Sequence, residues 1–199
     1  MPLPAGLYTI ADADFGDPVA LGLALARAGA ATVQLRAKGW SPSAVERAAR
    51  ALMPELTARG CLLVVNDHLD VATAVGAPAV HLGQEDGPAR IDEARAALPP
   101  GVLIGRSTRT LEQVAQAQDA DYIGFGPVFA TTTRAGSPAP RGTALLAQAV
   151  AASRIPVVAI GGISADNVAS VRASGAHAWA VISALLTAPD LDAAMFALR

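Results

Sequence analysis

The chain has 199 residues, of which 52% are hydrophobic, and a formal net charge of -2 with an isoelectric point near 5.9. This length supports one well-buried core, so we expect a single domain spanning residues 1–199. The charge balance provides no general basic field, which argues against nucleic-acid partners and against binding to an anionic membrane surface. No leader pattern or run of eighteen apolar residues occurs, and we expect a cytoplasmic protein.

The single cysteine, Cys61, lies in the apolar run 61–65. A reactive thiol needs exposure and a neighbour that stabilises its thiolate form, and this run offers neither. We therefore expect a buried, inert thiol, and a single cysteine excludes a disulfide within the chain.

Short apolar runs rich in β-branched residues alternate with alanine-rich amphipathic stretches along the whole sequence. This alternation predicts parallel βα units, whose strands are covered on both faces. In chain order, the expected strands are Leu7–Ile10, Thr32–Leu35, Leu62–Val65, Ala79–Leu82, Leu103–Gly105, Tyr122–Gly124, Val157–Ile160 and Trp179–Ile182.

The segments between these strands carry the expected helices. Asp17, Ser41 and Thr110 are suited to N-caps, and the expected helix ends lie at Gly29, Gly60, Gly76 and Gly175. Eight βα units close most simply into a compact (β/α)8 TIM barrel, an α/β fold, with short helices in a chain of this length. The alternative is an open doubly wound sheet, but residues 11–16 lack the glycine fingerprint expected after its first strand.

Polar residues cluster where the expected strands end, which is where barrel enzymes carry their active sites. Gln34, Arg36 and Lys38 follow the second strand at a spacing of two residues, so an extended chain puts them on one side. Two cations and an amide suit a pyrophosphate group. A solvated basic strand end explains the same triplet equally well.

Carboxylates follow the third and fourth strands. Asp67 comes directly after Asn66, and Asp86 ends the run 83–86. Two carboxylates on neighbouring strand ends can share Mg²⁺, which also accepts water and phosphate oxygens as ligands. Taken separately, Asp67 could cap a helix and Asp86 could lie in a solvated loop.

The later strand ends offer groups that bind anions. Ser107 follows the fifth strand, and the sixth runs into a hydroxyl-rich loop that Arg134 closes. Gly161 and Gly162 end the seventh strand, a usual position for a phosphate site in barrels. His81 lies within a strand, which favours a satisfied core histidine over a metal ligand.

The motifs at these strand ends closely resemble those of thiamine phosphate synthase. The resemblance covers nearly the whole chain and rests on blocks at 34–38, 65–67, 81–86, 105–107, 126–133, 159–163 and 181–184. It implies a (β/α)8 enzyme that joins hydroxymethylpyrimidine pyrophosphate to thiazole phosphate. The family reaction releases pyrophosphate first, and the thiazole nitrogen then attacks a pyrimidine-stabilised carbocation.

The same resemblance implies a role for each matching residue. The pyrimidine pyrophosphate would be held by Gln34, Leu35, Arg36, Ala37, Lys38, Asn66, Ser107 and Arg134, among which Arg36, Lys38, Ser107 and Arg134 would act in catalysis. The thiazole phosphate would be held by Thr131, Thr132, Thr133, Gly162, Ile182 and Ser183. Asp67 and Asp86 would hold Mg²⁺. Synthases of this family can self-associate, so a homo-oligomer is compatible with the resemblance.

Two other functions remain open at this point. A thiazole tautomerase branch shares the fold and needs neither pyrophosphate nor Mg²⁺, and Gly105, Arg106 and Ser107 resemble that branch as well. That branch typically lacks the pair equivalent to Asn66 and Asp67 and has a histidine at the position of Pro127, so these residues favour the synthase. The third hypothesis is a non-catalytic, phosphate-binding regulatory relative.

Overall fold

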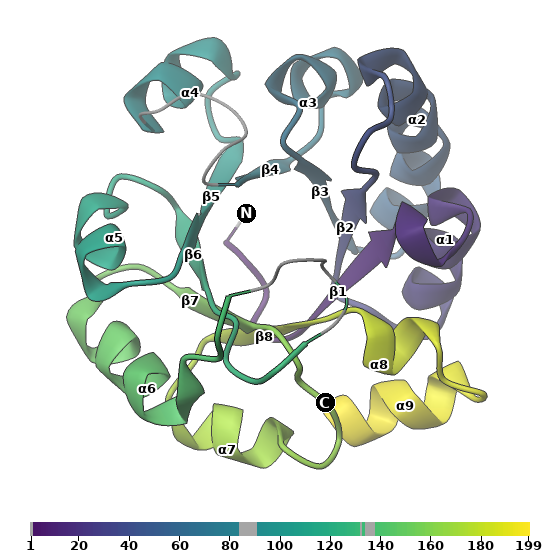
Figure 1. The fold of residues 1–199 in the computed structure, drawn as a ribbon. Coiled ribbons are helices and arrows are strands. Elements are labelled where there is room, and N and C mark those ends of the chain that lie inside the picture. The colour runs from purple at the N-terminus through teal and green to yellow at the C-terminus, as the bar shows by residue number, and fades with distance from the viewer. Residues whose placement is uncertain (1, 84–90, 132, 134–137) are drawn as a thin grey trace.

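Eight parallel strands close into a barrel surrounded by helices (Figure 1). The computed structural model describes residues 2–83, 91–131, 133 and 138–199. Each strand pairs with its neighbours in chain order, and β1 closes the ring by pairing with both β2 and β8. The predicted (β/α)8 barrel is therefore confirmed.

The strands coincide closely with the predicted runs. They are β1 (Gly6–Asp12), β2 (Thr32–Arg36), β3 (Leu62–Asn66), β4 (Ala79–Leu82), β5 (Leu103–Thr108), β6 (Tyr122–Phe125), β7 (Val157–Ile160) and β8 (Ala178–Val181). The largest difference is β5, which continues three residues beyond the predicted end at Gly105. Its polar residues stay in the ladder because β6 runs alongside them, with Ser107 opposite Gly124 and Thr108 opposite Phe125.

The outer ring consists mainly of short helices, as the chain length requires. The helical elements are η1 (Ala13–Phe15), α1 (Pro18–Arg27), α2 (Pro42–Ala58), α3 (Leu69–Val75), α4 (Ile91–Ala97), α5 (Leu111–Gln116), α6 (Gly142–Ala152), α7 (Val168–Ala173), α8 (Ser183–Leu186) and α9 (Leu191–Leu198). Their lengths run from 4 residues in α8 to 17 in α2. Among the described residues, no helix is both long and apolar enough to span a membrane.

Local sequence signals set the helix ends. The side chains of Asp17, Ser41 and Thr110 accept backbone N–H groups at the starts of α1, α2 and α5, which confirms the three predicted N-caps. Gly76 ends α3 in the left-handed conformation, with φ at 66°. That conformation favours glycine because a Cβ atom would crowd the backbone.

Two apolar layers pack on opposite sides of the sheet. The larger layer lies between the strands and the helices, and the smaller one fills the barrel interior with residues such as Tyr8, Ile10, Val64 and Tyr122. The N-terminal segment lies within the ring of strands in Figure 1, and Leu3 packs into the inner layer. The carbonyl of Leu3 also lies 3.0 Å from the His177 imidazole Nε2. The inner layer thus closes the barrel at the amino ends of its strands and leaves the carboxyl ends open.

Cys61 provides a test of this packing. Its side chain is 5% exposed, and burial raises the pKa of its thiol to about 12. Because the thiolate is the form that attacks disulfide reagents, we expect negligible reaction of the native protein with an aromatic disulfide reagent at pH 8, and prompt reaction of one thiol per chain in denaturant. Stoichiometric labelling under native conditions would show that the layer around Cys61 is not closed.

Candidate active site

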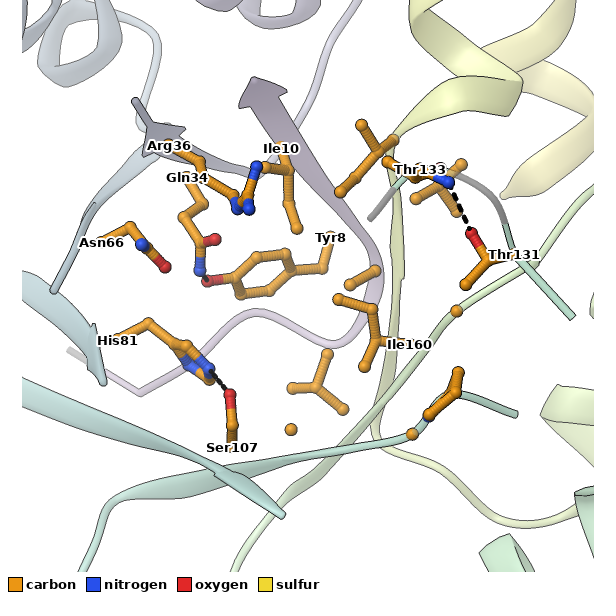
Figure 2. A pocket seen from close by; sticks show the side chains of 18 of the residues that line it. Tyr8, Ile10, Gln34, Arg36, Asn66, His81, Ser107, Thr131, Thr133 and Ile160 are labelled. Carbon is orange, nitrogen blue, oxygen red and sulfur yellow. Dashed lines mark hydrogen bonds between the residues drawn. The ribbon is translucent and has the colours of Figure 1, made fainter. Parts of the chain in front are cut away.

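A pocket opens at the carboxyl ends of the barrel strands, and residues from all eight strands or the segments that follow them line it (Figure 2). This is the face at which barrel enzymes carry their chemistry. Most of the predicted site residues meet there. The predicted residues that line the pocket are Gln34, Arg36, Lys38, Asn66, Asp67, Ser107, Thr131, Thr133, Gly162, Ile182 and Ser183.

Strand alternation explains which residues of the block at 34–38 reach the pocket. Gln34 and Arg36 point into the barrel, whereas Leu35 and Ala37 are buried in the layer beneath the helices. Successive side chains of a strand face opposite sides of the sheet, so these two sets cannot share one surface. The side chains of Leu35 and Ala37 therefore do not line the pocket.

The first two strands place a guanidinium beside a buried carboxylate. Arg36 Nη1 lies 2.5 Å from Oδ2 of Asp12, whose side chain is 1% exposed, and 3.5 Å from Oδ2 of Asp14. The other Asp12 oxygen accepts the backbone N–H of Asp14, so the carboxylate is held from two directions. A guanidinium has five N–H donors, and this pairing fixes the plane in which the remaining donors lie.

Asp67 forms a second charged cluster at the end of β3. Its Oδ2 pairs with the Lys38 ammonium at 2.8 Å and accepts a hydrogen bond from the Asn66 amide, while Oδ1 accepts the backbone N–H of Gly83 at 3.1 Å. Asp67 also has a φ of 66°, the only positive value among the non-glycine residues that the structure describes. The backbone here turns sharply as the strand ends, which directs the carboxylate to the pocket.

The donor set around Asp67 fits an open cation site. A carboxylate has about four lone-pair positions, and the three contacts of Asp67 leave one for a cation. Mg²⁺ typically binds one or two protein carboxylates and completes its shell with water and phosphate oxygens. Within the described part of the chain, no group of three or more His, Cys, Asp or Glu residues could hold a metal, so a closed protein cage is absent there. Asp86, the second predicted ligand, lies outside the described residues.

His81 is hydrogen-bonded at both ring nitrogens. Nε2 lies 2.9 Å from the Ser107 hydroxyl, and Nδ1 lies 3.2 Å from the Tyr122 hydroxyl. The predicted satisfied histidine is confirmed by these bonds, yet its ring also lines the pocket, which the sequence did not indicate. Burial lowers the pKa of His81 to about 4, so its imidazole is neutral at physiological pH.

The opposite side of the pocket carries the hydroxyl groups. The Thr133 hydroxyl lies 3.3 Å from that of Ser183, and the Thr133 backbone N–H donates to the Thr131 hydroxyl. Figure 2 shows Thr131 and Thr133 well apart from Asn66, His81 and Ser107. Thr132 and Arg134 lie outside the described residues. The pocket therefore has two polar sides, one on β2 to β5 and one on the segments after β6 and β8.

Glycines allow the segments after β6 and β7 to approach closely. A Cβ on Gly162, whose φ is 64°, would clash with the Ala130 carbonyl oxygen, and one on Gly161 would lie 2.5 Å from Cβ of Pro127. The pair thus holds the hydroxyl loop against the barrel. Pro127 itself lines the pocket at the position where a tautomerase would typically have a histidine.

Among the pocket residues that sequence reasoning missed are four with polar side chains in the barrel interior: Tyr8, Asp12, His81 and Tyr122. The signal was present in the alternation of the strands. Once Arg36 is placed in the pocket, Asp12 pairs with it in register, and Tyr8 lies four residues earlier on the same face of β1. His81 lies two residues before Gly83, so the same alternation places it on the pocket side of β4. Arg109 also lines the pocket.

The family model described as thiamine monophosphate synthase matches residues 7–185. The chain belongs to this family. It is 46% identical to a thiamine-phosphate synthase of Anaeromyxobacter dehalogenans over 191 residues, which cover 95% of this chain and 84% of the relative. It is 42% identical to one of Methanoculleus marisnigri over 198 residues, covering 97% and 93% of the two chains.

A solved structure agrees with these sequence relatives. The thiamine phosphate pyrophosphorylase of Pyrococcus furiosus superposes with a TM-score of 0.88 at 36% identity, covering 98% of this chain and 94% of that one. The family indicated by the strand-end motifs is thereby confirmed, together with its transferase class.

Gly105 is the position that tests the packing of this site. A Cβ there would overlap the Tyr122 ring and lie 2.5 Å from Nδ1 of His81. Because Tyr122 is fully buried and cannot move aside, we expect Gly105→Ala to lower the free energy of unfolding by about 3 kcal/mol. Denaturant unfolding would measure the change.

Gly124→Ala serves as the matched control on the next strand. A Cβ at Gly124 would have its nearest neighbour, Cε1 of His81, at 3.3 Å, which requires only a small adjustment. We expect a clearly smaller loss of stability. Equal losses in the two variants would contradict the assignment of the clash to Tyr122.

Proposed function

We propose that this protein joins hydroxymethylpyrimidine pyrophosphate to thiazole phosphate in a Mg²⁺-dependent reaction that forms thiamine phosphate and releases pyrophosphate. The observation that carries the proposal is the division of one pocket between two polar sides. One side, with Arg36, Lys38, Asn66 and Ser107, suits a polyanionic leaving group. The other, with its threonines and Ser183, suits the phosphate of the second substrate.

The first side favours departure of pyrophosphate by neutralising charge. Arg36 offers a planar fork that matches two phosphoryl oxygens, and Lys38 provides a compact charge. Both cations are already held by carboxylates, Asp12 and Asp67, so little reorganisation is needed when the leaving group gains charge. Gln34 and Asn66 add amide donors that orient the pyrimidine substrate.

Asp67 is the described residue that would hold Mg²⁺, with Asp86 as its proposed partner. When bound, the cation would neutralise charge on the pyrophosphate oxygens. The Asn66 amide and the Gly83 N–H hold the carboxylate in place before any cation arrives. Lys38 pairs with the same carboxylate, so Asp67 would hold both the ammonium and the cation for the leaving group.

The second side positions the thiazole phosphate. Thr131, Thr133 and Ser183 are close enough to bind one phosphate with short donors, and Gly162 brings the backbone near them. Thr132 and Ile182 are proposed to bind the same phosphate. Placing this substrate opposite the leaving group aligns its nitrogen with the carbon that loses pyrophosphate, and such alignment replaces much of the entropy cost of the encounter. Arg134 is proposed to bind the pyrophosphate of the other substrate, as the family resemblance implies.

Pro127 disfavours the tautomerase, and the cations held at Asp12 and Asp67 suit a reaction that releases pyrophosphate. A purely regulatory phosphate binder would need only the second side. A single domain over 1–199, a cytoplasmic location and self-association stay predictions from the sequence.

The reaction is tested by measuring pyrophosphate release. We expect release with both substrates and Mg²⁺ present, and its loss when either substrate is omitted or when a chelator removes the cation. Isomerisation of the thiazole carboxylate phosphate without the pyrimidine substrate would instead identify a tautomerase. Binding of both phosphates without any turnover would identify the regulatory alternative.

Asp67→Ala tests the cation site. Because the variant removes the carboxylate that faces the leaving group, we expect turnover at saturating substrates to fall at least about tenfold. Thiazole phosphate binding, measured by calorimetry, should be largely unchanged, since that phosphate lies on the other side. Asp70→Ala is the control, because Asp70 is exposed on α3 and lies outside the pocket. Unchanged turnover in Asp67→Ala would refute the assignment of the metal ligand.

A further inference from the structure

Five side chains from five different strands form one hydrogen-bonded chain across the barrel interior. Nε2 of Gln34 lies 2.8 Å from the Tyr8 hydroxyl, which lies 3.2 Å from the Tyr122 hydroxyl. The chain continues through the two ring nitrogens of His81 and ends at Ser107 in the pocket. Figure 2 shows its two ends, with Gln34 directed at Tyr8 and His81 at Ser107.

The donor and acceptor chemistry of these groups gives a direction in which the protons of this hydrogen-bonded series point. The Gln34 amide nitrogen only donates, so the Tyr8 oxygen accepts from it. Either hydroxyl can donate in the bond between the two tyrosines, and we assign the Tyr8 proton to Tyr122 because that bond gives the buried proton an acceptor. With this assignment the Tyr122 proton is directed at Nδ1 of His81, and Nδ1 is the acceptor. A neutral imidazole that accepts at Nδ1 carries its proton on Nε2, and that proton goes to the Ser107 oxygen.

Burial keeps both tyrosines in the protonated state that this direction requires. Tyr8 and Tyr122 are 2% and 0% exposed, and burial raises the pKa of both hydroxyls, so each keeps its proton. The two ring nitrogens of His81 each contact one hydroxyl, so a ring that accepts at Nδ1 and donates at Nε2 has a partner on both sides. Each group therefore has one proton to give, and the proton positions depend on one another along the chain.

We propose that Gln34, Tyr8, Tyr122 and His81 form a one-way hydrogen-bond relay that makes Ser107 an acceptor toward His81 and thereby directs the Ser107 proton to the anionic substrate. Tyr122 and His81 are thus positioning residues that act through Ser107. The inference deepens the proposed function, because the anion would be the pyrophosphate-bearing substrate. The direction of the relay itself does not depend on that function.

The link between Tyr122 and His81 is the decisive one. In Tyr122→Phe, Nδ1 has lost its donor, and the imidazole can move its proton to Nδ1 and accept from Ser107 instead. Ser107 then gives its proton to His81 rather than to the substrate. In Tyr8→Phe, which makes the same chemical change one step earlier, Tyr122 keeps its hydroxyl and its bond to His81.

The tautomer of His81 can be observed directly by nitrogen-15 NMR of protein labelled at histidine. The protein has three histidines, and the signals that disappear in His81→Gln are those of His81. We expect the Nε2-protonated tautomer in the wild type and in Tyr8→Phe, and a shift of the proton toward Nδ1 in Tyr122→Phe. An Nδ1-protonated ring in the wild type would overturn the proposal, whatever reaction the protein catalyses.

Turnover provides the second readout. We expect kcat to fall about tenfold to a hundredfold in Tyr122→Phe and only a few-fold in Tyr8→Phe, with KM for thiazole phosphate unchanged. In a Ser107→Ala background, Tyr122→Phe should cause little further loss, because the relay then has no end point. Equal losses in the two tyrosine variants, or additive losses with Ser107→Ala, would overturn the proposal. If the wild type releases no pyrophosphate, the proposed function fails while the NMR result still decides the relay.

Discussion

The closed parallel ladder, in which β1 pairs with β8, is the constraint on which the rest of this structure depends. Closure gives all eight strands a shared interior, and the pleat sends every second side chain into it. Polar groups from distant parts of the sequence therefore meet without the aid of long loops. Asp12 and Arg36, 24 residues apart, pair because their strands are in register.

An interior of this kind has a graded polarity. Near the closed end, aliphatic residues and Leu3 fill the barrel, and hydroxyls and amides appear only as the strands approach the open mouth. Every buried polar group in that zone needs a partner, because an unpaired one costs about 1–3 kcal/mol. The tyrosines satisfy this requirement through each other and through Gln34 and His81. The hydrogen bonds that satisfy the buried polar groups of the barrel therefore also hold the pocket side chains in position.

The sequence predicted the fold well because its strongest signals are local. Apolar runs, N-caps such as Ser41 and terminal glycines each act within a few residues, and together they locate the βα units. The site was predicted less completely. Leu35 and Ala37 came from a contiguous motif, and only the pleat separates them from Gln34 and Arg36. His81 and Tyr8 were missed as pocket groups because their partners lie 26 residues or more away in the chain.

The crowding at Gly105 also limits how this sequence can change over time. The space that a methyl group would need at position 105 is already filled by the ring of Tyr122. A larger residue at 105 is therefore tolerated only if a smaller one arrives at 122, and that second change would remove the hydroxyl that bonds to His81. The two positions should vary together among relatives, and a lineage that exchanges both would also have to find a new partner for its histidine.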